Sequence, residues 1–415
     1  MTTLSRWMRA TVLTGVAVIG LASCSMNVDN PSVIDAGKFN PNSDGATLAL
    51  SAQTNFYIAF QSVAMFGGLI SDEVWTGAVR LQTNRLSARN FASTDDINAD
   101  FFAPLSLAIA SNQNAVGVLG KGPNASTDTN LATAAMNLGF SLDLMAETMC
   151  SGVIQGGPEL SDTQLLDTAI TAFTQAITVA SAAGPAGATI VNGSNVGLAR
   201  AYLQLGDFAN AATTAALVPS DFLINVVTSA NVSTQSVLGN TYFGNALQGQ
   251  IIAPKLYRIA DPRMPIDSTT PGSTLNQQPY VIQAKYTSYA DPIRLGSGLE
   301  AQYIVAEAEL HASGATGDAV TLINARRAAG GEGAYAGSTS DTLAVLGELL
   351  NQRARDFWME GKKLGDLRRN PSVPLAAVLT DPVGAPFYTN SGGGPFGSNF
   401  CAPIPPEETN ANPNF

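Results

Sequence analysis

The sequence predicts a mainly α-helical fold built from pairs of neighbouring helices. Within residues 299–370, apolar side chains recur at spacings of three and four residues, which is the period of one helix face. Alanine is frequent in the helical stretches, where it favours the helix and allows close packing between helices. Gly206 and Gly314 interrupt the helical pattern where turns between helices are expected.

The clearest helical pattern lies in residues 299–370. It predicts three helices, over Leu299–Leu310, Asp318–Ala329 and Thr342–Glu360. Asp341 is placed to cap the third helix, and Gly361 is placed to end it in a left-handed conformation. Further helices are predicted over Leu48–Phe66, Asp95–Leu119, Leu131–Met149, Ser161–Ala182 and Val196–Leu217. The helix from Leu48 ends at Gly67-Gly68, and the helix from Asp95 is interrupted near Pro104. The stretch from Val196 is a helical hairpin broken at Gly206.

An internal repeat supports the interpretation as helix pairs. Gly206 is followed five residues later by Ala211, and Gly314 is followed at the same spacing by Ala319. The stretch from Tyr202 to Ala211 is similar to a tetratricopeptide hairpin, in which small residues let the second helix pack on the first. Because the spacing is loose, the repeat by itself predicts only a scaffold of helix pairs.

Two regions lack helical periodicity. Ser220–Pro292 is rich in Gly, Pro and Thr, and predicts loops with a few short strands. Pro371–Phe415 is rich in Pro, Gly and Asn, and predicts an irregular segment that wraps over the helices. We interpret both regions as parts of a single domain that spans residues 36–415.

The N-terminus resembles an export signal. Two arginines precede an apolar run that is too short to span a bilayer, which requires roughly 20 residues. The sequence Leu21-Ala22-Ser23-Cys24 resembles a bacterial lipobox, which predicts a lipoprotein signal peptide over residues 1–23, lipidation of Cys24 and a tether over residues 24–35. Ser25 after the cysteine favours the outer membrane, by resemblance to lipoproteins in general. An ordinary secretory signal with a chance cysteine is the alternative.

Two cysteines remain in the predicted mature chain. An oxidising compartment permits a disulfide between Cys150 and Cys401. Two buried free thiols are the alternative. Neither cysteine has a Cys-x-x-Cys neighbour, so a metal or redox role is not expected.

Composition narrows the possible functions. A formal net charge of −11 disfavours nucleic acid as a partner. The chain has one histidine, His311, which cannot form a multi-histidine metal site, and its place near a helix end has a simple structural explanation. The sequence also lacks a Walker motif, a dinucleotide fingerprint and a nucleophile elbow, so it predicts no enzyme, no cofactor and no metal.

Two groups of residues are candidates for a ligand site. Trp75 lies in a predicted loop, where its ring could stack on a sugar or could instead anchor the loop to the protein. A cluster of basic residues could bind an anion or could pair internally with Asp356, Glu360 and Asp366. These basic residues are Arg353, Arg355, Lys362, Lys363, Arg368 and Arg369.

Several motifs together resemble the SusD/RagB family of nutrient-binding outer-membrane lipoproteins. Two helical motifs carry the first similarity, Glu300-x-x-Tyr303-x-x-Ala306-Glu307-Ala308 and Ala319-x-x-x-Ile323-Asn324-x-x-Arg327. Further similarities lie at Arg353–Gly361 with Asp366–Arg369, at the turn Asp261-Pro262-Arg263, and at Cys401–Pro405 and Asn410–Asn414. The chain departs from the family at Ala329, Gln352, Asp356 and Leu364-Gly365, where an arginine, two glutamates and an aromatic pair are usual.

The resemblance implies a SusD-like helical fold with tetratricopeptide-type helix pairs and irregular insertions. It also implies a non-catalytic, lipid-anchored protein on the outer face of the outer membrane. Such a protein binds an oligosaccharide or polysaccharide and passes it to a SusC-like TonB-dependent transporter. Ligand contacts in the family come from variable loops, which by position would include the Trp75 region and Ser220–Pro292. The alternatives are a peptide or another nutrient as ligand, an anchored hydrolase, or a general tetratricopeptide scaffold of the cell envelope.

Overall fold

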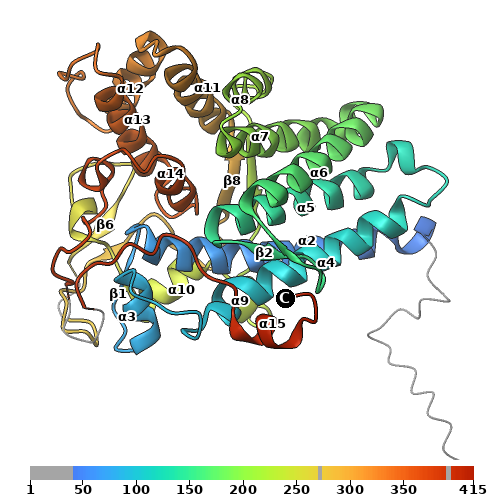
Figure 1. The fold of residues 1–415 in the computed structure, drawn as a ribbon, viewed down its shortest axis with the longest axis horizontal. Coiled ribbons are helices and arrows are strands. Elements are labelled where there is room, and N and C mark those ends of the chain that lie inside the picture. Colours follow the sequence, from blue (N-terminus) through green and yellow to red (C-terminus); the bar gives the residue numbers. More distant parts are fainter. Residues whose placement is uncertain (1–40, 270–272, 389–393) are drawn as a thin grey trace, which may run out of the picture. The chain divides into compact units, whose positions relative to one another are not determined.

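The fold is built mainly from helices, in agreement with the predicted fold class (Figure 1). The computed structural model describes residues 41–269, 273–388 and 394–415. The longer helices are α2 (Pro41–Ile70), α4 (Ala103–Leu119), α5 (Thr129–Thr148), α6 (Asp162–Ala182), α7 (Ala188–Leu205), α8 (Phe208–Ala215), α11 (Gly298–Ser313), α12 (Gly317–Ala329) and α13 (Thr342–Asp356). The shorter ones are α3 (Leu81–Ser87), α9 (Gln235–Leu238), α10 (Thr241–Leu247), α14 (Lys363–Arg369) and α15 (Pro406–Ala411), with a π-helical turn η1 (Asn98–Phe102) and 3-10 turns η2 (Ala125–Thr127), η3 (Gly184–Gly187), η4 (Lys255–Tyr257) and η5 (Leu375–Val378).

Residues Gly45–Phe415 form one compact unit. The predicted signal peptide, the predicted tether and the predicted domain boundary at residue 36 lie outside the described residues. These three assignments therefore stay predictions.

Consecutive helices pack on one another as pairs. Helix α5 packs on α4 and α6, α7 on α6 and α8, α11 on α8 and α12, and α12 on α13. Gly206 ends α7 with a φ of 77° and Gly314 ends α11 with a φ of 70°, as the repeat predicted. Phe173 of α6 fills the space that small residues leave. A Cβ at Gly139 of α5 would lie 2.7 Å from its ring, and a Cβ at Gly197 of α7 would lie 2.3 Å from it.

The strands among the described residues are short and pair two by two. The antiparallel pairs are β1 (Trp75–Thr76) with β5 (Ile251–Ile252), β2 (Gly152–Val153) with β3 (Glu159–Leu160), β4 (Leu223–Val226) with β8 (Ile293–Ser297), and β6 (Ile266–Asp267) with β7 (Ile282–Gln283). In the longest pair, Leu223 lies opposite Ser297 and Val226 opposite Ile293. The region Ser220–Pro292 thus has the predicted loops and strands, and it also holds α9 and α10, which the sequence analysis did not predict.

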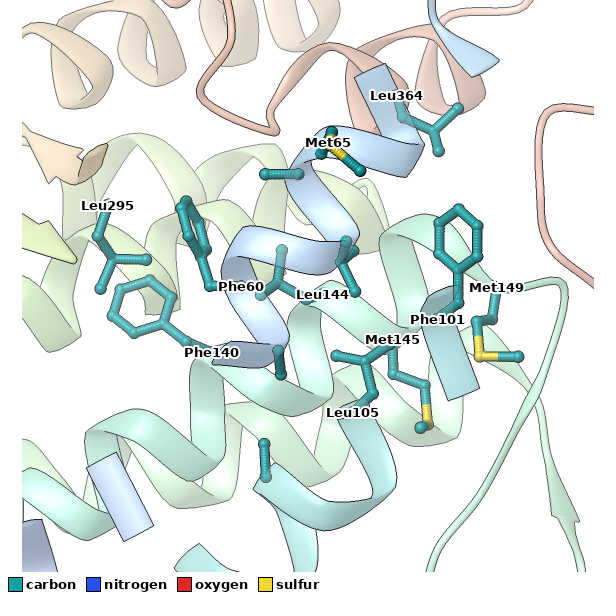
Figure 2. Close-up of a cluster of buried hydrophobic side chains, with 14 of the residues drawn as sticks. Phe60, Met65, Phe101, Leu105, Phe140, Leu144, Met145, Met149, Leu295 and Leu364 are labelled. Carbon is teal, nitrogen blue, oxygen red and sulfur yellow. The ribbon is translucent and has the colours of Figure 1, made fainter. Parts of the chain in front are cut away.

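Helix α2 supplies much of the hydrophobic core. Figure 2 shows its Phe60 and Met65 in one cluster with Phe101, Leu105, Phe140 and Leu144, which come from η1, α4 and α5. The predicted end of this helix at Gly67-Gly68 is wrong, because α2 continues to Ile70. A Cβ at Gly67 would lie 3.6 Å from Leu364, and a Cβ at Gly68 would lie 3.5 Å from Val74. The two glycines therefore leave room for neighbouring chain inside a continuous helix.

Helix α13 ends at Asp356, four residues before the predicted end at Glu360. The chain turns after Asp356, and Met359 and Gly361 adopt left-handed φ values of 57° and 71°. Contacts with Glu73 replace the missing helical turn. Its backbone carbonyl accepts the indole N–H of Trp358 at 2.7 Å, and its carboxylate accepts the backbone N–H of Met359 at 3.0 Å.

A buried carboxylate connects three regions of the scaffold. Glu300 of α11 accepts a hydrogen bond from Arg200 of α7 at 2.9 Å. It also lies 3.7 Å from the guanidinium of Arg353 and 3.8 Å from the ammonium of Lys362. Burial alone would raise the pKa of Glu300, but these three cations lower it below its ordinary value. By contrast, burial and the neighbouring Glu147 raise the pKa of Asp143 well above its ordinary value.

The end of α5 is tied to the C-terminal segment. The sulfur atoms of Cys150 and Cys401 are 2.00 Å apart, as in a disulfide, and their Cα atoms are 5.0 Å apart. Two backbone hydrogen bonds of 2.8 Å flank the sulfur atoms, from Cys150 to Ala402 and from Ala402 to Thr148. The predicted wrap of residues 371–415 is thereby held against the helices at this point.

We expect Glu360 to stabilise the folded protein above about pH 4.5 and to lose this effect as the pH falls toward 2. Burial would raise the pKa of Glu360, but Lys285 at 2.6 Å and Arg294 at 2.7 Å hold it at about 2, against an ordinary value of 4.5. Glu360→Gln should therefore lower the free energy of unfolding near neutral pH by about 3 kcal/mol. Chemical denaturation at neutral and acidic pH measures this difference, which should shrink in acid. Glu407→Gln, at an exposed position, is the control; a loss of equal size at both pH values would contradict the expectation.

The cysteine pair gives a second prediction. A chain that begins at Ser25 should show no reactive thiol when it is denatured without reductant. Replacing both Cys150 and Cys401 by serine should lower the free energy of unfolding by about 2–5 kcal/mol. Thiol labelling with mass spectrometry and denaturant titration measure the two effects. Two labelled thiols per chain would show that the bond does not form.

Candidate functional site

The structure places the predicted site residue Trp75 inside the protein. Its side chain is 3% exposed, and its indole stacks on Tyr388 with ring centroids 4.0 Å apart and an interplanar angle of 7°. The indole N–H donates to the carboxylate of Asp72 at 3.1 Å, and Asp72 pairs with buried Arg89 at 2.7 Å. These contacts support the anchor interpretation of Trp75, because a sugar would find no open ring face here. The other predicted position, Cys24, lies outside the described residues.

The predicted basic cluster is held by internal contacts. The pairs are Arg353 with Asp366 at 2.8 Å, Arg355 with Glu332 at 2.6 Å, Lys362 with Glu360 at 3.8 Å, Arg368 with Asp162 at 2.6 Å, and Arg369 with Glu307 at 2.7 Å. Lys363 donates to the backbone carbonyl of Leu379 at 2.9 Å. Asp356 has other partners than expected, since Arg326 and Tyr303 bind its carboxylate. The cluster therefore braces the scaffold and does not form an open anion site.

His311 also has structural partners. It lies in the last turn of α11 and stacks on Phe208 with ring centroids 4.6 Å apart. Its Nε2 lies 3.1 Å from the side-chain oxygen of Asn370. Among the residues that the structure describes, no group of three or more His, Cys, Asp or Glu side chains is arranged to hold a metal ion.

A pocket between α2 and the segment of α9 and α10 is the best candidate for a ligand site. It has a volume of about 490 Å³. Its two sides come from α2 and from the region Ser220–Pro292, where the family resemblance placed ligand contacts. We call it the amide pocket, and it is lined by Ile58, Gln61, Ser62, Met65, Phe66, Gln235, Ser236, Val237, Gly239, Asn240, Thr241, Gly244, Asn245, Gln248 and Tyr289.

Gln61 provides a buried hydrogen-bond donor on the α2 side. Its side chain is 3% exposed, and its Oε1 accepts the backbone N–H of Thr241 at 3.2 Å. Because that backbone group can only donate, it fixes which end of the amide is the oxygen. The remaining Nε2 finds no acceptor among the described residues. A buried donor without an acceptor costs about 1–3 kcal/mol. Because Nε2 has almost no accessible surface, the acceptor of a bound molecule meets it only after a small shift of the lining.

Helix α10 provides an oriented acceptor on the other side. Asn240 caps this helix, since its Oδ1 accepts the N–H of Phe243 at 3.0 Å while its Nδ2 donates to the carbonyl of Asp291 at 2.8 Å. The amide of Asn245 is also fixed, because its Nδ2 donates to the carbonyl of Thr241 at 2.8 Å and to the sulfur of Met65 at 3.0 Å. Oδ1 of Asn245 is left to accept a hydrogen bond from a ligand.

Tyr289 adds an aromatic ring to the pocket. The ring meets Phe243 edge to face, with centroids 4.9 Å apart and an interplanar angle of 89°. It also lies close to two glycines, since a Cβ at Gly239 would be 2.8 Å from it and a Cβ at Gly244 would be 3.0 Å from it. Larger residues at these positions would displace the ring. The ring position is thus set by the shape of α9 and α10.

The described side chains that line the amide pocket carry no charge. Amides and hydroxyls can donate and accept hydrogen bonds, and the pocket also holds aromatic and aliphatic surface. This combination complements a sugar, which presents hydroxyl groups at its edge and C–H groups on its face. Apart from the phenol of Tyr289, the lining within the described part of the chain offers no acid or base that could transfer a proton. The arrangement is therefore suited to binding.

A second hollow, of about 480 Å³, lies between α8, α11 and α12. Its lining is mostly small and aliphatic, with Ala215, Val218, Ala301, Val305 and Leu322 among its residues. Few of its groups could hydrogen-bond to a polar ligand. We therefore consider the amide pocket the better candidate for a site that binds a hydrophilic ligand.

The sequence analysis predicted the region of the amide pocket but not its residues. Gln61 is the one amide within the apolar stretch Phe56–Phe66, and Asn240 precedes a short helix as a cap. These are the available local signals. Neither signal shows that the two segments meet. Asn245 and Met65 are in contact although they are 180 residues apart in the chain.

Comparison with known proteins identifies the fold. No protein-family model matches the sequence, and no curated protein matches it by sequence. Solved structures do match. A SusD superfamily protein from Parabacteroides distasonis has a TM-score of 0.67 at 14% identity, covering 91% of this chain and 98% of that one.

Two further matches are glycan-binding proteins. Surface glycan-binding protein A from Bacteroides uniformis has a TM-score of 0.67 at 14% identity, covering 90% of this chain and 98% of that one. Surface glycan-binding protein A from Bacteroides thetaiotaomicron, solved in complex with laminarihexaose, has a TM-score of 0.67 at 12% identity, covering 89% and 97% of the two chains. The chain thus has the fold of the SusD superfamily, as its motifs predicted.

Proposed function

We propose that this protein captures an oligosaccharide or polysaccharide in the amide pocket. The observation that carries the proposal is a pocket of uncharged polar groups with a buried, unpartnered donor at Gln61. The fold supports it, because two proteins that share this fold are surface glycan-binding proteins. The phenol ring of Tyr289 and the amide of Asn245 supply the aromatic and hydrogen-bonding contacts that a sugar requires.

We further propose that the protein acts at the cell surface as a lipoprotein. The support is the sequence Leu21-Ala22-Ser23-Cys24, which follows a short apolar run. Lipidation of Cys24 would hold the domain to the outer membrane through the tether at residues 24–35. In this arrangement the bound glycan passes to a SusC-like TonB-dependent transporter, and the protein itself performs no chemistry on it.

Tyr289→Ala tests the site. Loss of the ring removes the aromatic contact, and we expect it to weaken glycan binding about tenfold or more. Affinity electrophoresis through gels that contain a polysaccharide identifies the ligand, and calorimetric titration with its oligosaccharides measures the affinity. Tyr335→Ala is the matched control, since Tyr335 packs at the cluster formed by α11, α12 and α13.

Three outcomes separate the possibilities. Weaker binding by Tyr289→Ala alone supports the amide pocket. If both variants bind the glycan as tightly as the native protein does, the glycan binds elsewhere on the protein. If the native protein binds no polysaccharide at all, the glycan proposal is wrong, and peptides become the ligands to test.

Cys24→Ala tests the anchor. Without a thiol at this position no lipid can be attached, so we expect the protein to lose detergent-phase partitioning and radiolabelled fatty acid. Ser23→Ala keeps the cysteine and a small residue before it, and should leave both properties intact. Continued labelling of the Cys24→Ala chain would place the lipid at another residue.

A further inference from the structure

We propose that the amide pocket selects neutral glycans over acidic ones. This inference rests on the proposed function and adds the class of substrate. It depends on two features of the described residues that line the pocket, namely the absence of a cationic side chain and the presence of hydrogen-bond acceptors as well as donors.

A carboxylate or sulfate that enters the pocket would lose water without gaining a counter-charge. Among the residues that the structure describes, no lysine, arginine or histidine lines the pocket. Lys285 and Arg294 are the basic residues before and after Tyr289 in the chain. Both bond to the carboxylate of Glu360, at 2.6 and 2.7 Å respectively. Burial of an unpaired ion costs several kcal/mol, which neutral amide and hydroxyl donors offset only in part.

The groups around the donor of Gln61 also favour a neutral partner. Asn245 presents its Oδ1 as an acceptor, because its Nδ2 is used by Thr241 and Met65. A sugar hydroxyl can accept from Gln61 and donate to Asn245, whereas an ionised carboxylate can only accept.

The donor and the acceptor are held rigidly. Gln61 is on a core helix between Phe60 and Val63, which are both 1% exposed, and Thr241 fixes its Oε1. Asn245 is anchored to the same helix through Met65. Recognition groups held in this way lose little conformational freedom when a ligand binds. Within the described lining, a charged ligand also finds no flexible cation that could pair with it.

A matched pair of ligands provides the first test. A panel of neutral polysaccharides, namely laminarin, starch, galactomannan and galactan, is compared with polygalacturonate, alginate and chondroitin sulfate. The neutral polymer that binds best is then oxidised at its primary hydroxyl to the uronic acid, which preserves the backbone. We expect at least one neutral polymer to bind, and we expect its affinity to fall at least about tenfold after oxidation.

The outcomes distinguish this inference from the proposed function. Equal or tighter binding of an acidic polymer, or of the oxidised form, would overturn the inference and leave glycan capture intact. Absence of binding to every polymer would overturn both. Binding to neutral polymers with unchanged affinity after oxidation would also overturn the selectivity for neutral glycans.

Two substitutions then test the residues. Gln61→Leu keeps the approximate size of the side chain and removes the donor, so neutral glycan affinity should fall about tenfold. Gln53→Leu is the control on the same helix, outside the pocket lining. Ser236→Arg, at an exposed lining position, adds a cation and should raise affinity for the oxidised polymer about tenfold.

Circular dichroism and thermal unfolding establish that each variant is folded. If Gln61→Leu is unfolded, the Ser236→Arg variant still decides the question. A folded Ser236→Arg protein that discriminates against the oxidised polymer as strongly as the native protein does would contradict the electrostatic basis of the inference. Native affinity in a folded Gln61→Leu protein would remove Gln61 from the recognition of the glycan.

Discussion

The scaffold depends on the buried carboxylate of Glu300 and the cations around it. Arg200, Arg353 and Lys362 approach it from α7, from α13 and from the turn before α14. Arg200 and Lys362 also bond to the carbonyl of Leu295 in β8, at 3.0 and 3.2 Å. Removal of this one carboxylate would take one partner from each of three buried cations, and breaking a buried ion pair typically costs 3–5 kcal/mol. The same contacts position β8, which is the strand that follows the Tyr289 loop. The charged contacts around Glu300 therefore also help to position one side of the pocket.

Helix α2 has a double role that explains the rigidity of the candidate site. Phe60 and Val63 face the core, whereas Gln61 and Ser62 face the amide pocket. Ser62 is also fixed, since its hydroxyl donates to the carbonyl of Asp100 at 2.9 Å. Recognition groups on a core helix lose little conformational freedom on binding. The rest of the described lining comes from α9, α10 and the Tyr289 loop.

The helix pairs were predictable because their signals are local. Gly206 and Gly314 end helices in left-handed conformations, and alanines recur at helical spacing. The errors arose where distant contacts override local preference, as at Gly67-Gly68, which packs close to Leu364 within a continuous helix. The end of α13 is another case, because Glu73 binds the turn beyond Asp356. The pocket could be placed only by region, since its amides come from segments whose contact no local pattern encodes.

The link between Cys150 and Cys401 encloses most of the chain in one covalent ring. The two residues are 251 positions apart, and the segment between them includes α6 to α14, the charged brace, and the α9, α10 and Tyr289 part of the pocket. A protease that cuts one peptide bond in this segment opens the ring without separating the two pieces. The exposed tips of Ser220–Pro292 are the natural targets of such a cut. A singly cut protein would thus keep both sides of its pocket on one covalently connected molecule.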